Sequence, residues 1–268
     1  MLLVTGASGQ LGSLIHSRLV DLGLDPLAGT REPTRFGALG RAMDFDDETS
    51  LDFTGVETLV LISAGYAEDD VVIARHDRVI SAAEKFGVGH VIYTSLTVAG
   101  DHLAFALAHR WTERRLQEST VSWTILRNGL YAELFGQLAI PADGIISAPF
   151  GDGSLAAVAR EDLADVAAAV ASNPSLHQNA VYELAGAQAI TAADLAKEIG
   201  AVYEPGSLSA TRASLDAGGL LPFQPPMLVS IFSAVAAGFL GSTQTDLEKL
   251  LSHEPRNILA IAAKAAQW

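Results

Sequence analysis

The chain of 268 residues carries 17 lysines and arginines against 31 aspartates and glutamates, and its net charge of −14 argues against binding to nucleic acid or to an anionic membrane. A composition that is 49% hydrophobic and free of cysteine supports a large buried core and excludes disulfides, thiolate nucleophiles and cysteine-bound zinc. The N-terminus lacks the basic and apolar segments of a signal peptide, so we expect a cytoplasmic protein.

Short apolar runs alternate with amphipathic helical patterns through the first half of the chain. Strands that are joined through helices need crossover connections, which favours parallel pairing. We therefore predict an α/β fold with a Rossmann-type parallel sheet, helices on both of its faces, and a small, mostly helical C-terminal lobe. The predicted strands cover residues 1–6, 25–31, 57–65, 90–95 and 122–128, and the predicted helices cover residues 10–23, 70–87 and 104–119.

The alternation loosens after residue 128. A helix over 160–172, a strand over 180–186 and a helix capped by Thr191 are predicted, and everything after residue 205 has a helical pattern. The apolar stretch 225–241 is shorter than the ~20 residues of a membrane span, which favours a buried helix or a pocket wall. These apolar helices leave open whether the chain forms a homodimer. We predict two domains: an NAD(P)-binding core of residues 1–130, to which 155–186 returns, and a smaller substrate-binding lobe of residues 131–154 and 187–268.

The segment VTGASGQLG, residues 4–12, places glycines between the first strand and the first helix. At such a turn backbone N–H groups and the helix dipole face one anion, which is how Rossmann folds hold a pyrophosphate. Gly6 permits the tight turn, Gly9 lets the backbone approach a phosphate, and Gly12 lets the helix pack closely. Ser8 adds a hydroxyl donor. No lysine follows as in a P-loop, so the motif predicts a dinucleotide site rather than an ATPase.

The end of the second strand indicates which dinucleotide is bound. An NAD site places an acid there for the ribose 2′-hydroxyl, but this chain has Arg31, with Arg35 four residues later. A guanidinium pairs with a 2′-phosphate through two donors, which favours NADPH, although Glu32 is a contrary signal. The alternative is that both arginines are solvated surface charges.

The acid–base motif of typical short-chain dehydrogenases is absent from this sequence. None of the 5 tyrosines is followed four residues later by a lysine, so carbonyl reduction by a Tyr-x-x-x-Lys pair is disfavoured. A quinone or other conjugated acceptor takes hydride with less help, and its proton can come from water. Tyr131 and His109 are candidate proton donors, and Phe135 and Phe150 candidate pocket walls.

For several residues the sequence allows two interpretations of their role. His109 and Glu113 have the i, i+4 spacing of metal ligands, but an ion pair within the helix or a contact to the cofactor ribose fits better, so no metal is predicted. The acid run 44–48 is typical of a helix N-terminus. His76 faces either the cofactor or solvent, and Tyr131 is either catalytic or part of the core.

In order and spacing, the chain resembles the NmrA-like atypical short-chain dehydrogenase/reductases in the segments VTGASGQLG, TREP, LVLISAG, ARHDRVISAAEKFGVGHVIYTSL, HRWTERRLQES, WTILRNGLYAE, GDGSLAAVAREDLADVAAAV and VYELAG. The most family-specific pieces are HxxTE at 109–113 and LRNGLYAE at 126–133. Within that family the resemblance is to bacterial type-2 NADPH-dependent quinone oxidoreductases and triphenylmethane reductases, and it extends to about residue 200. It implies an NADPH site whose pyrophosphate loop is Gly6, Ser8, Gly9, Gln10 and Leu11, with Arg31 at the 2′-phosphate and Asp44 and Phe45 at the adenine. It further implies that Ile62, Ser63 and Ala64 line the cofactor, that Tyr93, Thr94, Ser95 and His109 lie near the nicotinamide and its ribose, and that Asn128, Gly129 and Tyr131 form the substrate site. Leu130 departs from the family's frequent tryptophan.

Two functions follow from these observations. The first is an NADPH-dependent reductase of a small aromatic or quinone-like substrate, with Tyr131, Asn128 and His109 as candidate catalytic residues. The second is a redox sensor of the NmrA type, which binds NADP(H) and turns nothing over. The missing Tyr-x-x-x-Lys fits both, whereas the stretch from Asn128 to Tyr131 favours the enzyme.

Overall fold

The computed structural model describes residues 1–64 and 66–267. The chain divides into two compact units, and it passes between them several times. Unit 1 comprises Met1–Ser95, Leu107–Arg127 and Leu163–Tyr182, and unit 2 comprises Leu96–Ala106, Asn128–Asp162 and Glu183–Trp268. The predicted roles of a cofactor domain and a substrate-binding lobe stay predictions.

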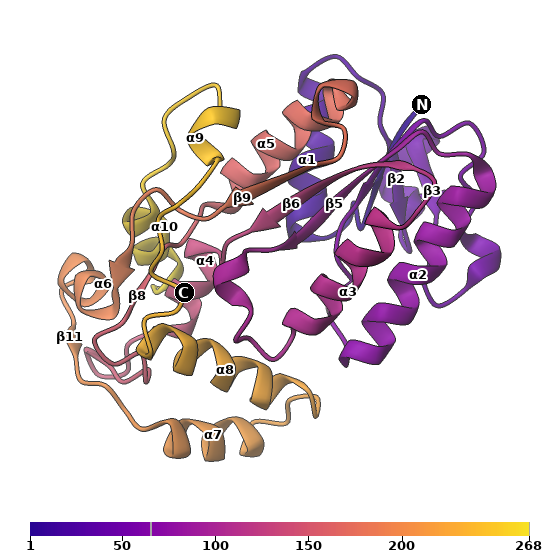
Figure 1. Ribbon diagram of the computed structural model, residues 1–268. Coiled ribbons are helices and arrows are strands. Elements are labelled where there is room, and N and C mark those ends of the chain that lie inside the picture. The colour runs from indigo at the N-terminus through magenta and orange to yellow at the C-terminus, as the bar shows by residue number, and fades with distance from the viewer. Residues whose placement is uncertain (65, 268) are drawn as a thin grey trace. The chain divides into compact units, whose positions relative to one another are not determined.

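A seven-stranded sheet in the order β3-β2-β1-β4-β5-β6-β9 is the main architectural element (Figure 1). The pairs β1–β2, β1–β4, β2–β3 and β4–β5 are parallel, with Val4 aligned to Ala28 on one side and to Val60 on the other. The strand order reverses direction at β1, which is where open α/β sheets bind ligands. The strands are β1 (Leu2–Thr5), β2 (Leu27–Thr30), β3 (Gly40–Ala42), β4 (Thr58–Leu61), β5 (His90–Leu96), β6 (Ser122–Asn128) and β9 (Ala180–Leu184).

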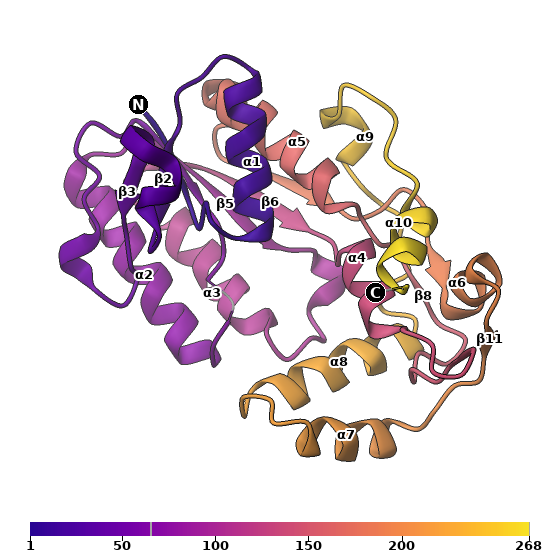
Figure 2. The ribbon, with the colours of Figure 1, turned by 180° about the vertical axis from the view of Figure 1, so that it is seen from behind.

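Helices cover both faces of this sheet, as predicted. Helices α1 (Gln10–Asp21) and α5 (Arg160–Ser172) lie on one face, and α2 (Asp69–Phe86) and α3 (Ala106–Gln117) lie on the other (Figures 1 and 2). Every residue of β4 and β5 is buried, which explains the short apolar run in each, and the buried residues also include the polar Thr58, His90, Thr94 and Ser95. The Rossmann-type fold class is therefore confirmed, and the predicted helices begin and end within two residues of the observed ones. The prediction missed β3, which is only three residues long and contains a glycine.

Unit 2 has its own apolar core, which includes Phe135, Phe150 and Phe232 with ring centroids 4.9 Å apart in successive pairs. Phe135 and Phe150 are at most 1% exposed. The prediction that they line a pocket is wrong, because both rings are buried against other side chains of this core.

Two short sheets, β10–β8 and β11–β7, also belong to the structure. The elements outside the large sheet are α4 (Ala132–Leu138), β7 (Ile145–Ile146), β8 (Ser154–Leu155), β10 (Ile190–Thr191), α6 (Ala192–Ile199), β11 (Val202–Tyr203), α7 (Leu208–Ala217), α8 (Gln224–Ala236), α9 (Leu247–Leu250), α10 (Ile258–Ala265) and the 3₁₀ turns η1 (Pro33–Leu39), η2 (Glu48–Ser50), η3 (Val98–Gly100) and η4 (Pro174–His177).

Some of the sequence predictions for unit 2 are confirmed and one is wrong. Thr191 caps α6 as predicted, in a reciprocal capping box with Asp194. The apolar stretch from residue 225 lies mainly in α8, a helix with buried residues, as expected. The prediction that everything after 205 is helical is wrong, because 237–246 and 251–257 are irregular. In the ranges 1–64 and 66–267 no helix has both the length and the apolar character that crossing a bilayer requires.

Candidate functional site

The glycine loop joins β1 to α1 in unit 1. Gly6 has a φ of +58°, in the left-handed region that favours glycine, and the Gly9 N–H donates to the Gly6 carbonyl oxygen at 2.9 Å. A Cβ on Gly12 would lie 2.2 Å from that same oxygen, so a side chain there would force α1 away from the loop. The close helix packing predicted for Gly12 is thus what the structure has.

A pocket of about 450 Å³ opens beside this loop at the carboxyl ends of β1, β2 and β4. Most of the residues expected to bind cofactor line it, and six further residues that the sequence did not single out join them. The predicted residues in its wall are Gly6, Ser8, Gly9, Arg31, Asp44, Phe45, Ile62, Ser63 and Ala64. The others are Gly29, Thr30, Met43, Asp46, Tyr66 and Arg75.

Not every predicted cofactor residue lies in that wall. Gln10 and Leu11 form the first turn of α1, where Leu11 is buried in packing. Tyr93, Thr94 and Ser95 lie within the fully buried strand β5. Their predicted contacts with a cofactor stay predictions.

Ser8 and Arg31 are the two side chains of this pocket best suited to an anion. Thr30 Oγ1 donates to Ser8 Oγ at 2.8 Å, so the Ser8 hydroxyl keeps its own proton for another acceptor. Arg31 is exposed and makes no hydrogen bond or ion pair with any residue that the structure describes. Arg35, by contrast, pairs with Glu32 at 3.3 Å on the surface and does not line the pocket. Of the two predicted arginines, Arg31 lines the pocket, and its predicted contact with a phosphate stays a prediction.

The segment 62–64, which follows β4 and lines the pocket, is held by side chains from three other elements. Its three successive backbone N–H groups each donate to a side-chain acceptor, so its conformation is set without any ligand. The hydrogen bonds run from Ile62 N to Thr5 Oγ1 (2.9 Å), from Ser63 N to Thr94 Oγ1 (3.0 Å) and from Ala64 N to His76 Nε2 (2.9 Å).

His76 is fully buried, so the interpretation that it faces solvent is wrong. Its Nε2 accepts from Ala64, which leaves the proton on Nδ1 for donation to Thr112 Oγ1 at 2.8 Å. Burial lowers the pKa of His76 to about 3, with the charges of His109 and Arg75 acting in the same direction. A neutral imidazole thus supports the pocket segment from within the protein.

Tyr93, which is buried, and His109, which is half-buried, form a second pair in unit 1. The Tyr93 hydroxyl lies 2.9 Å from His109 Nδ1. Burial raises the pKa of Tyr93, and burial together with Arg110 lowers the pKa of His109 to about 4. Both groups are therefore neutral near pH 7.

Glu113 has no free carboxylate oxygen for a metal. Ser95 Oγ donates to it at 2.6 Å, Arg110 at 2.8 Å, and Arg127 donates to both of its oxygens, at 3.0 and 2.7 Å. The predicted ion pair within the helix is therefore confirmed for Glu113, and its partner in that helix is Arg110. These contacts engage the Ser95 hydroxyl, whose predicted position near a nicotinamide stays a prediction.

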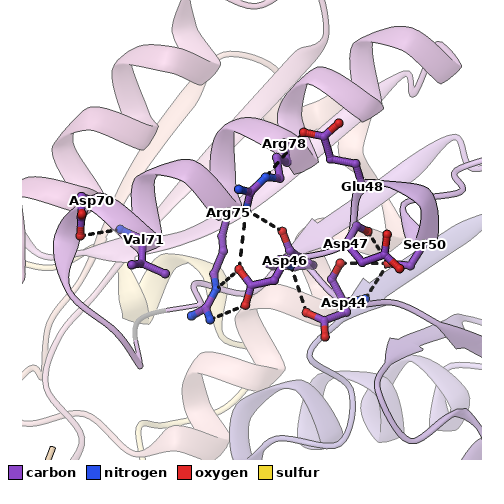
Figure 3. Close-up of polar contacts among 10 residues, drawn as sticks. Asp44, Asp46, Asp47, Glu48, Ser50, Asp70, Val71, Arg75 and Arg78 are labelled. Atoms are coloured by element: carbon purple, nitrogen blue, oxygen red, sulfur yellow. Dashed lines mark hydrogen bonds and ion pairs between the residues drawn. The ribbon is translucent and has the colours of Figure 1, made fainter.

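The acid run 44–48 builds a tight loop at the pocket wall (Figure 3). Asp44 Oδ1 accepts from Asp46 N at 3.0 Å, and Asp47 Oδ1 accepts from Thr49 N at 3.0 Å, where it caps the turn η2. The helix N-terminus interpretation is right for Asp47. It is wrong for Asp46, whose carboxylate pairs with Arg75 of α2.

Asn128 and Tyr131, the predicted catalytic residues of the substrate site, both belong to unit 2. Asn128 is 6% exposed, and its Oδ1 has no hydrogen-bond partner among residues 1–64 and 66–267. An unpaired buried acceptor costs about 1–3 kcal/mol, which a donor on a ligand would offset. The Arg160 guanidinium lies 4.5 Å from the centre of the Tyr131 ring, and burial raises the pKa of Tyr131. Leu130, which departs from the family pattern, packs in the core of unit 2.

The comparisons agree with the resemblance read from the sequence. A sequence profile described as NAD(P)H-binding matches residues 6–174. Quinone oxidoreductase 2 of Escherichia coli strain K12 is 35% identical in an alignment of 279 positions that covers 97% of this chain and 96% of that protein. The chain is also similar to the crystal structure of the Citrobacter sp. triphenylmethane reductase complexed with NADP(H), with a TM-score of 0.88, 27% identity, and coverage of 98% of this chain and 99% of that one. The NADPH complex of the E. coli NADPH-dependent quinone oxidoreductase gives a TM-score of 0.87 at 33% identity, over 98% of this chain and 99% of that one.

Proposed function

Because this chain belongs to the NAD(P)H-binding family and is an NADPH-dependent oxidoreductase, we propose that it reduces a quinone-like or other conjugated small molecule. The observation that carries this proposal is the pocket of unit 1, where one wall combines a glycine loop, the Ser8 hydroxyl and Arg31, which has no ion pair with residues 1–64 or 66–267. The names of the relatives, a quinone oxidoreductase and a triphenylmethane reductase, indicate the class of acceptor.

The residues of this pocket suit NADPH. Backbone N–H groups at the start of α1 would bind the pyrophosphate together with Ser8, and the Arg31 guanidinium would bind the 2′-phosphate. The segment 62–64 would lie along the cofactor, with its backbone fixed in advance by Thr5, Thr94 and His76. NADPH supplies the hydride when it is bound.

The remaining requirement is a proton. A quinone that accepts hydride must gain one proton to become a hydroquinone, and the anion formed first is stable enough to take that proton from water. Tyr131 is the candidate donor within the protein, since its phenol carries a proton at neutral pH and the Arg160 guanidinium beside the ring favours the phenolate that proton transfer would leave. Asn128 Oδ1, a buried acceptor without a partner in the described chain, would orient a substrate donor. His109, neutral and bonded to Tyr93, is placed by the resemblance at the cofactor ribose.

The test is NADPH oxidation with a panel of benzoquinones, naphthoquinones and cationic triphenylmethane dyes, followed by absorbance. We expect turnover with at least one acceptor, and less of it in the variant Tyr131→Phe. NADPH binding without turnover of any acceptor would reject the reductase and leave the redox sensor as the function.

A further inference from the structure

The pocket of unit 1 contains a second arginine whose charge is already engaged. Arg75 extends from α2 to the acid loop, where its Nε lies 2.9 Å from Asp46 Oδ1 and its terminal nitrogen 2.6 Å from Asp46 Oδ2 (Figure 3). Both side chains line the same pocket as Arg31. This paired geometry is the strongest that an arginine makes with a carboxylate.

Arg75 carries most of the neutralisation of Asp46. Arg78 is also near, but its terminal nitrogen is 3.6 Å from Asp46 and donates instead to the Phe45 carbonyl oxygen at 3.1 Å. The pKa of Asp46 is held below its ordinary value by Arg75 first, with smaller contributions from Arg78 and Arg31. Asp46 is therefore ionised at neutral pH and lies within electrostatic range of the arginine proposed to meet the 2′-phosphate.

An unmasked carboxylate at this position would have the opposite preference from Arg31. A carboxylate repels a 2′-phosphate and accepts a hydrogen bond from the 2′-hydroxyl of NADH, as the acid of NAD-type sites does. The charged residues of the pocket wall are Arg31, Asp44, Asp46 and Arg75, so their formal charges cancel only while both arginines are present.

We propose that Arg75 sets the preference for NADPH over NADH by masking the carboxylate of Asp46. The proposal rests on the proposed placement of the 2′-phosphate at Arg31. Arg75 acts through Asp46 and needs no contact with the cofactor, so it is a specificity-determining residue of a kind that no dinucleotide motif encodes.

Three variants test this proposal by the ratio of the dissociation constants for NADH and NADPH, measured by fluorescence titration without any substrate. Arg75→Gln unmasks Asp46, and we expect the ratio to fall by about tenfold, mainly through weaker NADPH binding. Asp46→Asn removes the charge, and we expect the ratio to rise by about two- to fivefold. The double variant Arg75→Gln/Asp46→Asn should return to at least the wild-type ratio, because no carboxylate is left to unmask.

Rescue by the second substitution separates masking from a structural role. If Arg75 only stabilises the fold, Arg75→Gln will weaken both cofactors equally and Asp46→Asn will not restore the ratio, and either result overturns the proposal. Arg115→Gln is the matched control, since Arg115 of α3 pairs with Asp77 and Glu84 of α2, the helix that carries Arg75, but does not line the pocket. It should leave the ratio unchanged.

The variant Arg31→Ala keeps this inference distinct from the proposed placement of the phosphate. Equal losses of NADPH and NADH in Arg31→Ala would show that the 2′-phosphate lies elsewhere. A selective loss of NADPH in Arg31→Ala, together with an unchanged ratio in Arg75→Gln, would reject the masking role alone.

Discussion

The two units each contain a pocket with an arginine in its wall, but the two arginines are in opposite electrostatic states. In unit 1, Arg31 has no ion pair with any described residue. In unit 2, Arg256 lines a pocket of about 290 Å³ but forms ion pairs with Asp162, which is 1% exposed, and with Glu161 at 3.2 Å. A cavity and an arginine do not make an anion site when the protein's own carboxylates already satisfy the guanidinium.

The backbone differs between the two pockets as well. The wall in unit 1 includes a glycine loop at the start of a 12-residue helix, which concentrates N–H donors. The wall in unit 2 adds two further acids, Glu248 and Glu254, to Asp162. Of these two pockets, the one in unit 1 is thus better suited to an anion, because its wall has backbone donors and Arg31, which makes no ion pair with any described residue.

The largest effect is expected from Gly9→Val, which tests whether the glycine loop makes the difference between the pockets. Gly9 has a φ of −79°, which valine can adopt, but its Cβ would lie 3.2 Å from the Gly6 carbonyl oxygen and its side chain would enter the space proposed for a phosphate. We expect NADPH affinity to fall by about a thousandfold or beyond detection, with folding retained by circular dichroism. Gly218→Val, in unit 2 at an exposed glycine with negative φ, is the control. Unchanged NADPH affinity would mean that the loop is only a turn.

A large loss of stability, without loss of cofactor affinity, is expected from Arg256→Ala. The substitution leaves the buried Asp162 carboxylate without its cation, which costs about 3 kcal/mol in the free energy of unfolding. Chemical denaturation measures the loss, and NADPH titration of the folded variant should match wild type. A tenfold weaker NADPH affinity would instead place an anion-binding role in unit 2.

Acid should destabilise the protein through the buried histidine behind the pocket of unit 1. The folded-state pKa of His76 is about 3, below the 6.5 of a free histidine, so its neutral form stabilises the fold above pH 6.5 and that contribution is lost as the pH falls toward 3. Between pH 7 and pH 5 we expect the protonation of His76 to lower the free energy of unfolding by about 2 kcal/mol.

The variant His76→Gln keeps an acceptor for Ala64 N–H but does not titrate, so denaturation at pH 7 and pH 5 should show a shallower pH dependence. His102→Gln, at an exposed histidine, serves as the control. An unchanged slope in His76→Gln would assign the acid sensitivity to other groups, of which His109 and His90 have pKa values lowered to about 4.

The smallest of these effects is expected from Arg31→Ala, and it is selective. Removing the guanidinium should weaken NADPH by about twentyfold and NADH by less than threefold, because only NADPH carries the 2′-phosphate. The same titrations on Arg256→Ala should show no selectivity. If both variants lost NADPH affinity twentyfold, the proposed difference in anion binding between Arg31 and Arg256 would be rejected.

The sequence predicted the sheet and its helices well because their signals are local. Buried parallel strands read as short apolar runs, as β4 and β5 do, and helices show the spacing of one apolar face. It also identified Gly6, Gly9 and Arg31, which stand at or just beyond the end of a predicted strand, where a parallel sheet brings such ends together, and the family resemblance added the segment 62–64.

The sequence could not predict features that depend on contacts between distant segments. Asp46 and Arg75 come from a loop and a helix 29 residues apart, and nothing near either residue indicates their pairing. The sequence left open whether His76 faces the cofactor or solvent, and its burial in the folded chain excludes solvent. Phe135 and Phe150 were expected in a pocket, because aromatic residues of a core and of a binding site look alike in sequence.

By itself, then, the sequence determined the dinucleotide-binding class, the parallel fold and the arginine at the end of β2, because strand periodicity, glycine conformation and a missing acid are all properties of neighbouring residues. Only the tertiary structure decided which charges stay available. Arg31 and Arg256 are chemically identical side chains, and the carboxylates that fold against one and not against the other settle what each can bind.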